Sequence, residues 1–190
     1  LTKISDAAAK SLGTFRGMTL KLSALEELSE GAAEGLAAYH GEHHLISLTS
    51  LSDGAAEKLS VHENTLKLDG LTELSDAAAQ SLGKHEYDLH LNGVTTLSDA
   101  AFAELATNKR TLSMDAITEL SDAAAESLST HKGPLYLYGI SSLGEDAAKT
   151  LAKKKKSDLF IDDGLHDLID PHRTGEEEED DDEGNWWEGD

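Results

Sequence analysis

The chain has 190 residues, no cysteine and a formal net charge of −21, from 37 acidic and 16 basic residues. Without cysteine it has no disulfide framework, thiolate nucleophile or cysteine-ligated metal site. A chain this acidic is not expected to bind nucleic acid or an anionic membrane surface, because both are negatively charged and bind Lys and Arg. The sequence also has no apolar run that approaches the roughly 18 residues needed to span a bilayer.

A block of about 23 residues repeats along most of the chain. A Ser-Asp or Ser-Glu pair marks one point of each block and recurs at residues 29, 52, 75, 98 and 121, while Gly144 continues the register and Ser5 joins it at a spacing one residue longer. A fixed period of roughly 20 to 50 residues predicts a stacked array in which each unit contacts only its neighbours. Leu1 and Ile4 fill the end of a block whose strand is missing, so we expect a fragment or processing product.

Each block opens with two apolar residues in alternation, clearest at Leu66 and Leu68, which predicts a short strand with one buried face. The matching pairs are Leu20/Leu22, Leu89/Leu91, Leu112/Met114, Leu135/Leu137 and, after a one-residue shift, Leu159/Ile161, whereas in the second coil the pair degrades to His43/Leu45. Two more apolar residues at a spacing of three then turn the chain. Gly70, Gly93 and Gly139 precede this corner, where backbones pass closely or φ takes a positive value.

The second half of each block predicts a short helix. Ser75 or Asp76 would cap its free N–H groups, and Ala78, Ala79 and Leu82 fall on one face. Strand, corner, helix and return within one period predict a right-handed α/β solenoid, with a parallel sheet on one face and short helices on the other.

The run L-x-L-x-x-L-x-x-L-S-D-x-A-A-x-x-L at residues 66–82 resembles the leucine-rich repeat family, and most of all its cysteine-containing subclass. Similar S-D-A-A-A-E-S-L units occur in bacterial arrays of that type. The resemblance implies a leucine-rich-repeat solenoid over residues 1–169, with an incomplete first coil and a protein-binding role. This sequence departs from the subclass in having a shorter block and no F-box segment. Apolar residues also replace the inward cysteine, at Leu25, Leu48, Leu71, Val94, Ile117 and Ile140.

In the family that the sequence resembles, the strand face turned away from the core is the usual binding surface. The middle strand positions here are Lys21, His44, Lys67, His90, Ser113, Tyr136 and Phe160. The positions that follow the second strand leucine are Ser23, Ile46, Asp69, Asn92, Asp115, Tyr138 and Asp162. Neighbouring exposed aromatics are typical of interface hot spots, although aromatics also suit strands or could cover the terminal edge. The residues predicted to bind a partner are Tyr136, Tyr138, Phe160, His90, Lys67, His44, Trp186 and Trp187.

Histidines recur at the predicted helix ends, where His62, His85 and His131 each follow a marker serine by ten residues. We interpret them as charged caps of the helix C-termini rather than as a metal ladder. The loop from His40 to His44 holds three imidazoles and Glu42, so zinc or nickel binding there is an alternative, but it lacks a ligand spacing signature. No nucleophile elbow or phosphate-binding loop is present, and we predict no enzyme, no metal site and no cofactor.

Residues 170–190 are predicted to form an acidic tail that contains eight consecutive acids, at 176–183, and both tryptophans of the chain. One hypothesis is that the tail folds back, with its acids over Lys153–Lys156 and Trp186 and Trp187 over the last coil. The other is that the tryptophan pair is a linear motif for a partner. Divalent cations would condense on the acids only weakly, because spaced ligands are lacking.

Taken together, these features predict a non-enzymatic protein–protein interaction module that binds through its strand face. One alternative is a structural segment of a longer array that self-associates through open solenoid ends. Another is an acidic surface protein that responds to calcium or other metals. We expect a soluble chain, and favour the cytoplasm over export.

Overall fold

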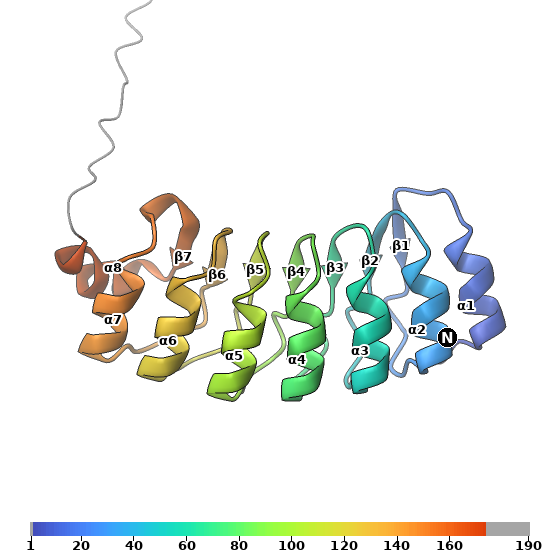
Figure 1. The fold of residues 1–190 in the computed structure, drawn as a ribbon, viewed down its shortest axis with the longest axis horizontal. Helices are drawn as coiled ribbons and strands as arrows, with labels where there is room; N and C mark the ends of the chain where they lie inside the picture. Colours follow the sequence, from blue (N-terminus) through green and yellow to red (C-terminus); the bar gives the residue numbers. More distant parts are fainter. Residues whose placement is uncertain (1, 174–190) are drawn as a thin grey trace, which may run out of the picture.

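A computed structural model describes residues 2–173 and shows a row of similar coils (Figure 1). Seven parallel strands form one sheet in the order β1 to β7, and in Figure 1 the helices α1 to α7 lie side by side as a second layer. The strands are β1 Thr19–Lys21, β2 Glu42–His44, β3 Leu66–Lys67, β4 Leu89–His90, β5 Leu112–Ser113, β6 Leu135–Leu137 and β7 Leu159–Ile161. The helices are α1 Asp6–Gly13, α2 Glu30–Ala37, α3 Asp53–Ser60, α4 Asp76–Gly83, α5 Asp99–Leu105, α6 Asp122–Ser129, α7 Glu145–Leu151 and α8 Asp163–Ile169, with short 3₁₀ turns η1 Lys156–Asp158 and η2 Asp170–His172.

The sheet register follows the repeat. Leu66 pairs with Leu89, Leu89 with Leu112 and Leu112 with Leu135, each pair being one repeat apart in the sequence. Leu135 pairs with Leu159, which lies one residue further along than the repeat alone would give, so the predicted one-residue shift is confirmed at the η1 turn. The predicted α/β solenoid with a parallel sheet is therefore confirmed.

The core is a continuous row between the two layers. On α4 the small side chains of Ala78 and Ala79 and the side chain of Leu82 are fully buried, so the helix lies close to the sheet. The inward position that carries Leu71 and Val94 is also buried and apolar in every coil. Each buried leucine side chain contributes on the order of 2 kcal/mol to folding, and this stacking stabilises helices of only seven or eight residues.

Serine hydroxyls cap six of the helices and also join neighbouring coils. Ser75 Oγ accepts a hydrogen bond from Ala78 N and donates one to Asp53 Oδ1 of the preceding coil, at 2.5 Å. Ser98 Oγ donates to Asp76 Oδ1 in the same way. The recurring Ser-Asp pair thus caps its own helix and accepts from the next coil, which explains why the pair repeats.

The N-cap residue of helix α7 is Gly144, which offers no side-chain cap and at which an added Cβ would lie 3.8 Å from Asp122 Oδ1. A serine there would supply both bonds that the other coils have. We expect Gly144→Ser to raise the free energy of unfolding by about 0.5 kcal/mol in urea denaturation. Gly144→Ala, which adds the Cβ without the hydroxyl, should give no gain, and an equal gain from alanine would contradict this explanation.

The corner glycines are needed for close approach rather than for an unusual backbone. A Cβ on Gly70 would lie 2.5 Å from Ile46 O and 2.8 Å from Leu48 O of the preceding coil, and Gly93 and Gly139 face equivalent carbonyls. None of the three has a positive φ. Glycine is therefore required at these corners because a side chain would clash with the backbone of the preceding coil, and not because φ is positive.

The last coil is covered by α8 and η2, in which Leu165 and Ile169 are buried. Packing continues past Ile169, because Arg173 donates hydrogen bonds to Lys154 O at 2.6 Å and to Asp170 Oδ1 at 2.9 Å. Residues 174–190, including Trp186 and Trp187, lie outside the described residues. The two hypotheses for the acidic tail therefore stay predictions.

Candidate functional site: the strand face

Three aromatic side chains meet on the sheet face opposite the helices. Tyr136 of β6 and Phe160 of β7 are paired in register, and their rings stack with centroids 4.3 Å apart and planes 6° apart. Tyr138 lies 6.1 Å from Tyr136 between ring centroids and is 51% exposed. Because Leu135 and Leu137 fill the core from the same strand, the tyrosines between and after them point outward. We call these three residues the aromatic cluster.

The other predicted strand-face residues form a separate polar track. His44, Lys67 and His90 are half-buried on β2, β3 and β4, in one register row. His44 Nε2 lies 3.1 Å from Glu42 Oε2, and burial lowers the pKa of His90 despite the nearby carboxylates. Ser113, which is small and buried, separates this track from the aromatic cluster. The structure therefore divides the predicted face into two parts.

The next row of the face has a structural use that the sequence reasoning missed. The side chains of Asp69, Asn92 and Asp115 each accept the backbone N–H of the following coil, from Asn92, Asp115 and Tyr138, at 3.1 to 3.2 Å. These side chains extend the sheet pairing beyond the strands. The recurrence of Asp or Asn at this position, once in each repeat, is the sequence signal that could have predicted this role.

A buried polar ladder runs through the corners where the helices lead into the strands. Its side chains sit ten residues after each marker position and are 5% exposed or less: Tyr39, His62, His85, Asn108, His131 and Lys154. Each of the later members reaches back to the preceding coil. Asn108 Nδ2 donates to His85 O at 2.6 Å, and Lys154 Nζ donates to His131 O at 2.7 Å. The ladder ties the coils together at a place where buried carbonyls need partners.

The expectation that the recurring histidines are charged caps is wrong. His62 and His85 are 1% exposed, and burial lowers the pKa of both, that of His62 to about 4. A neutral ring still holds a helix end, but that of the preceding coil: His85 Nδ1 lies 3.2 Å from Ser60 O of α3. The next coil covers the side chain, which is why the charge that a free helix end would favour is lost.

The three histidines of residues 40–44, of which His43 and His44 belong to β2, do not converge. His43 points into the core with Nε2 at 2.7 Å from Leu36 O, while His44 faces Glu42 and His40 lies 3.5 Å from Glu63. Within residues 2–173 no group of three His, Cys, Asp or Glu side chains is placed to hold a metal ion. The geometry of this loop does not support the zinc or nickel alternative.

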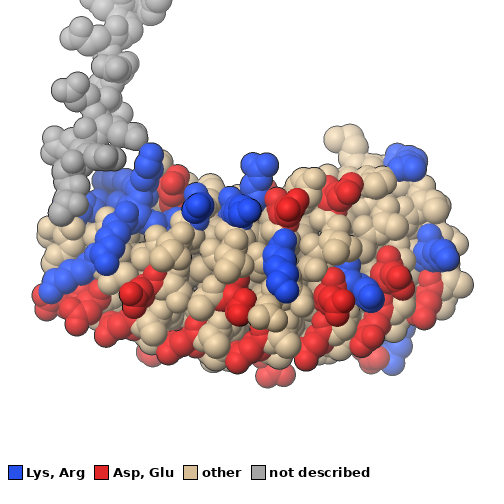
Figure 2. Space-filling model, viewed as in Figure 1, with Lys and Arg blue, Asp and Glu red and all other residues tan. Residues whose placement is uncertain are grey.

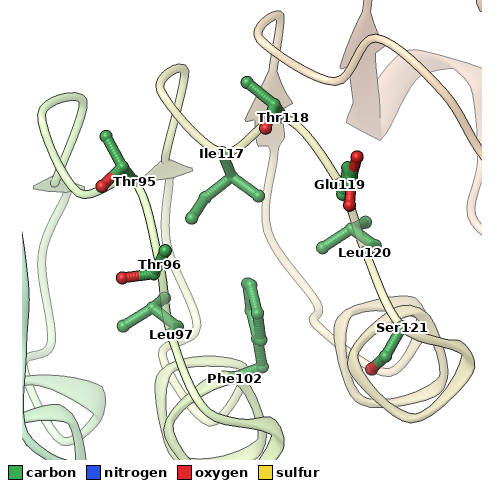
Figure 3. Close-up of a pocket in the computed structure, with 9 residues that line it drawn as sticks. All are labelled: Thr95, Thr96, Leu97, Phe102, Ile117, Thr118, Glu119, Leu120 and Ser121. Atoms are coloured by element: carbon green, nitrogen blue, oxygen red, sulfur yellow. The ribbon is translucent and has the colours of Figure 1, made fainter.

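A cavity of about 450 Å³ opens between the coils of α5 and α6 (Figure 3). Phe102 stands where the other coils have alanine, and Figure 3 shows its ring rising from α5 toward Ile117. The remaining lining is mainly aliphatic and hydroxyl side chains, with Glu119 the single charged group. We attribute the cavity to the bulk of Phe102 between two coils, and no convergent set of polar groups distinguishes it as a site.

The described residues thus define a solenoid repeat protein with an aromatic cluster on its strand face. A comparison with models of known protein families found no match, and neither did a comparison with curated proteins. Among the described helices, none combines the length and apolar character required to cross a membrane.

Proposed function

We propose that the chain is a non-enzymatic interaction module and that the aromatic cluster anchors a protein partner on the strand face. The observation that carries this proposal is the stacked pair of Tyr136 and Phe160 beside the half-exposed Tyr138. Rigid aromatic groups bury a large area at little cost in side-chain entropy, which makes them frequent hot spots of interfaces.

The rest of the face fits the same role. His44, Lys67 and His90 provide a polar track beside the anchor, as a polar rim does around an apolar interface centre. The resemblance to leucine-rich repeats supports the proposal, because that family uses the same face to bind proteins. Trp186 and Trp187, outside the described residues, would add a second contact in this proposal.

The test is a pull-down from the native source with the intact chain and with the triple variant Tyr136→Ala, Tyr138→Ala and Phe160→Ala as baits. We expect a partner to be captured by the intact chain and reduced at least about tenfold with the triple variant, because hot-spot truncations each cost more than about 1 kcal/mol. A matched control replaces three exposed apolar residues away from the strand face, Phe15, Met18 and Val61, with alanine. The control should keep the partner.

A second candidate is self-association of the chain. Met18 is 89% exposed and Phe15 is 52% exposed in the coil of β1, whereas α8 covers the coil of β7. Recovery of copies of the chain alone, abolished by the Phe15, Met18 and Val61 control and kept by the triple variant, would favour this candidate over partner binding.

A further inference from the structure

The helix-to-strand corners of the last three coils carry a group of exposed basic residues. Lys109, Lys132 and Lys155 are one repeat apart and occupy the same position of three consecutive coils, with Arg110 and Lys153 beside them. We call these five residues the basic corner patch. Figure 2 shows a dense group of Lys and Arg side chains at the α7–α8 end, further basic side chains along the rest of the molecule, and acidic side chains along the lower edge.

The patch brings like charges together, although the same position one coil before Lys109 holds the exposed acid Glu86. Adjacent coils are about 4.8 Å apart in the sheet, so residues in register lie on neighbouring backbones and repel one another. Within residues 2–173, no side chain of the patch forms an ion pair. An anionic group over the patch would relieve this repulsion.

Only two of the four lysines at 153–156 are exposed and outside an ion pair with the described residues. Lys154 is buried and its Nζ donates to His131 O and Gly133 O, at 2.7 and 2.9 Å. Lys156 lies 3.4 Å from Asp170. Lys153 and Lys155 are left to join the patch, so the basic surface is built across coils and not along the run.

The described chain ends beside this patch. Arg173 donates to the backbone carbonyl of Lys154, one residue from Lys155, and the eight consecutive acids begin three residues later in the sequence, at residue 176. Three residues can reach about 10 Å and eight can span about 26 Å, whereas the three coils of the patch cover about 10 Å. The acidic run is therefore long enough to reach and cover the basic corner patch, and its charge is opposite to that of the patch.

We propose that the basic corner patch binds the acidic run at residues 176–183 of the same chain. The carboxylates neutralise the lysines that the repeat places in register, and they withhold the patch from other polyanions. The contact is electrostatic, so it weakens as ionic strength rises and the Debye length falls.

Zero-length carbodiimide cross-linking of the full chain, followed by mass spectrometry, tests the proposal because the reagent joins only carboxylates and amines in contact. At low salt we expect cross-links from residues 176–183 to Lys109, Lys132 and Lys155, falling about fivefold or more in about 0.5 M NaCl. Exposed Lys10 and Lys21, in the coils of α1 and β1, are internal controls. Cross-links spread evenly over all exposed lysines would overturn the proposal.

Mixing isotope-labelled and unlabelled chains separates contact within one copy from contact between copies. Cross-links that join labelled to unlabelled chains would assign the acidic run to a neighbour and overturn the intrachain contact. Tryptophan fluorescence gives a second readout, because both tryptophans of the chain lie just beyond the acidic run. We expect their anisotropy to fall in the variant Lys109→Glu/Lys132→Glu/Lys155→Glu and to stay unchanged in Lys10→Glu/Lys21→Glu; equal values in both would contradict the proposal.

Discussion

Lowering the pH from 7 to 4 is expected to destabilise the solenoid through its buried histidines. Burial lowers the pKa of His43 and of His62 from 6.5 to about 4, so the folded state holds both rings neutral over a range in which the unfolded chain protonates them. Their contribution is fully present above pH 6.5 and is lost as the pH falls toward 4. The loss is on the order of 3 kcal/mol for each ring.

The packing of the two rings explains the size of this effect. His43 and His62 lie with centroids 4.3 Å apart, and His62 stacks on His85 at 6.3 Å. A proton on one ring would therefore place a charge beside the next imidazole in a buried corner. Besides burial, which is the largest cause, His62 lowers the pKa of His43 and His85 lowers the pKa of His62. The fully exposed acids of the body act in the opposite direction, because their protonation at low pH relieves negative repulsion.

The measurement is the free energy of unfolding by urea at several pH values between 7 and 4, for the intact chain and for His43→Leu. Leucine is the residue that the two neighbouring coils carry at this position, at Leu20 and Leu66. We expect the variant to be about 3 kcal/mol more stable than the intact chain at pH 4, after allowing for any difference at pH 7. His40→Gln, at a side chain that is 57% exposed, is the matched control and should follow the intact chain. Parallel profiles for all three proteins would show that buried histidine does not control acid stability.

The coil could be predicted from the sequence because its signals are local and repeated. Alternating apolar residues such as Leu66 and Leu68 specify a half-buried strand, and the Ser75-Asp76 pair specifies a helix start. Each weak signal recurs at one period, so the stack and the parallel register follow from the repeat itself. The outward direction of Tyr136 and Phe160 follows from the same alternation.

What a coil does to its neighbour could not be predicted in the same way. His62 and Lys154 look like exposed helix ends within their own block, and only the neighbouring coils make them buried. Asp69 and Asn92 look like solvent-facing polar residues, yet they accept backbone N–H groups from the next coil. The basic corner patch is similarly invisible in a linear reading, because a whole repeat separates each of its lysines from the next. Such roles depend on contacts about one period away in the sequence.

The largest effect of a single polar substitution is expected at Asn108, in the middle of the buried ladder. Its side chain donates to His85 O at 2.6 Å and to Tyr87 O at 3.2 Å, and accepts from Arg110 N at 2.7 Å. Asn108→Ala would leave these buried groups without partners and open a small void. We expect a loss of about 2 to 4 kcal/mol in the free energy of unfolding.

The repeat itself supplies the rescue variant. His85 occupies the same position one coil earlier, where its ring nitrogens lie 3.2 Å from Ser60 O and 3.0 Å from Asn64 O, and the single N–H of the neutral ring can donate to one of these carbonyls. Asn108→His should therefore recover a substantial part of the stability that Asn108→Ala loses, measured by urea denaturation at pH 7.5, where the imidazole is neutral. Recovery by histidine and not by the similarly sized Asn108→Leu would show that the ladder stabilises through its hydrogen bonds to the preceding coil. Equal recovery by leucine would mean that filling the corner is sufficient, because the buried carbonyls would then impose no need for a donor.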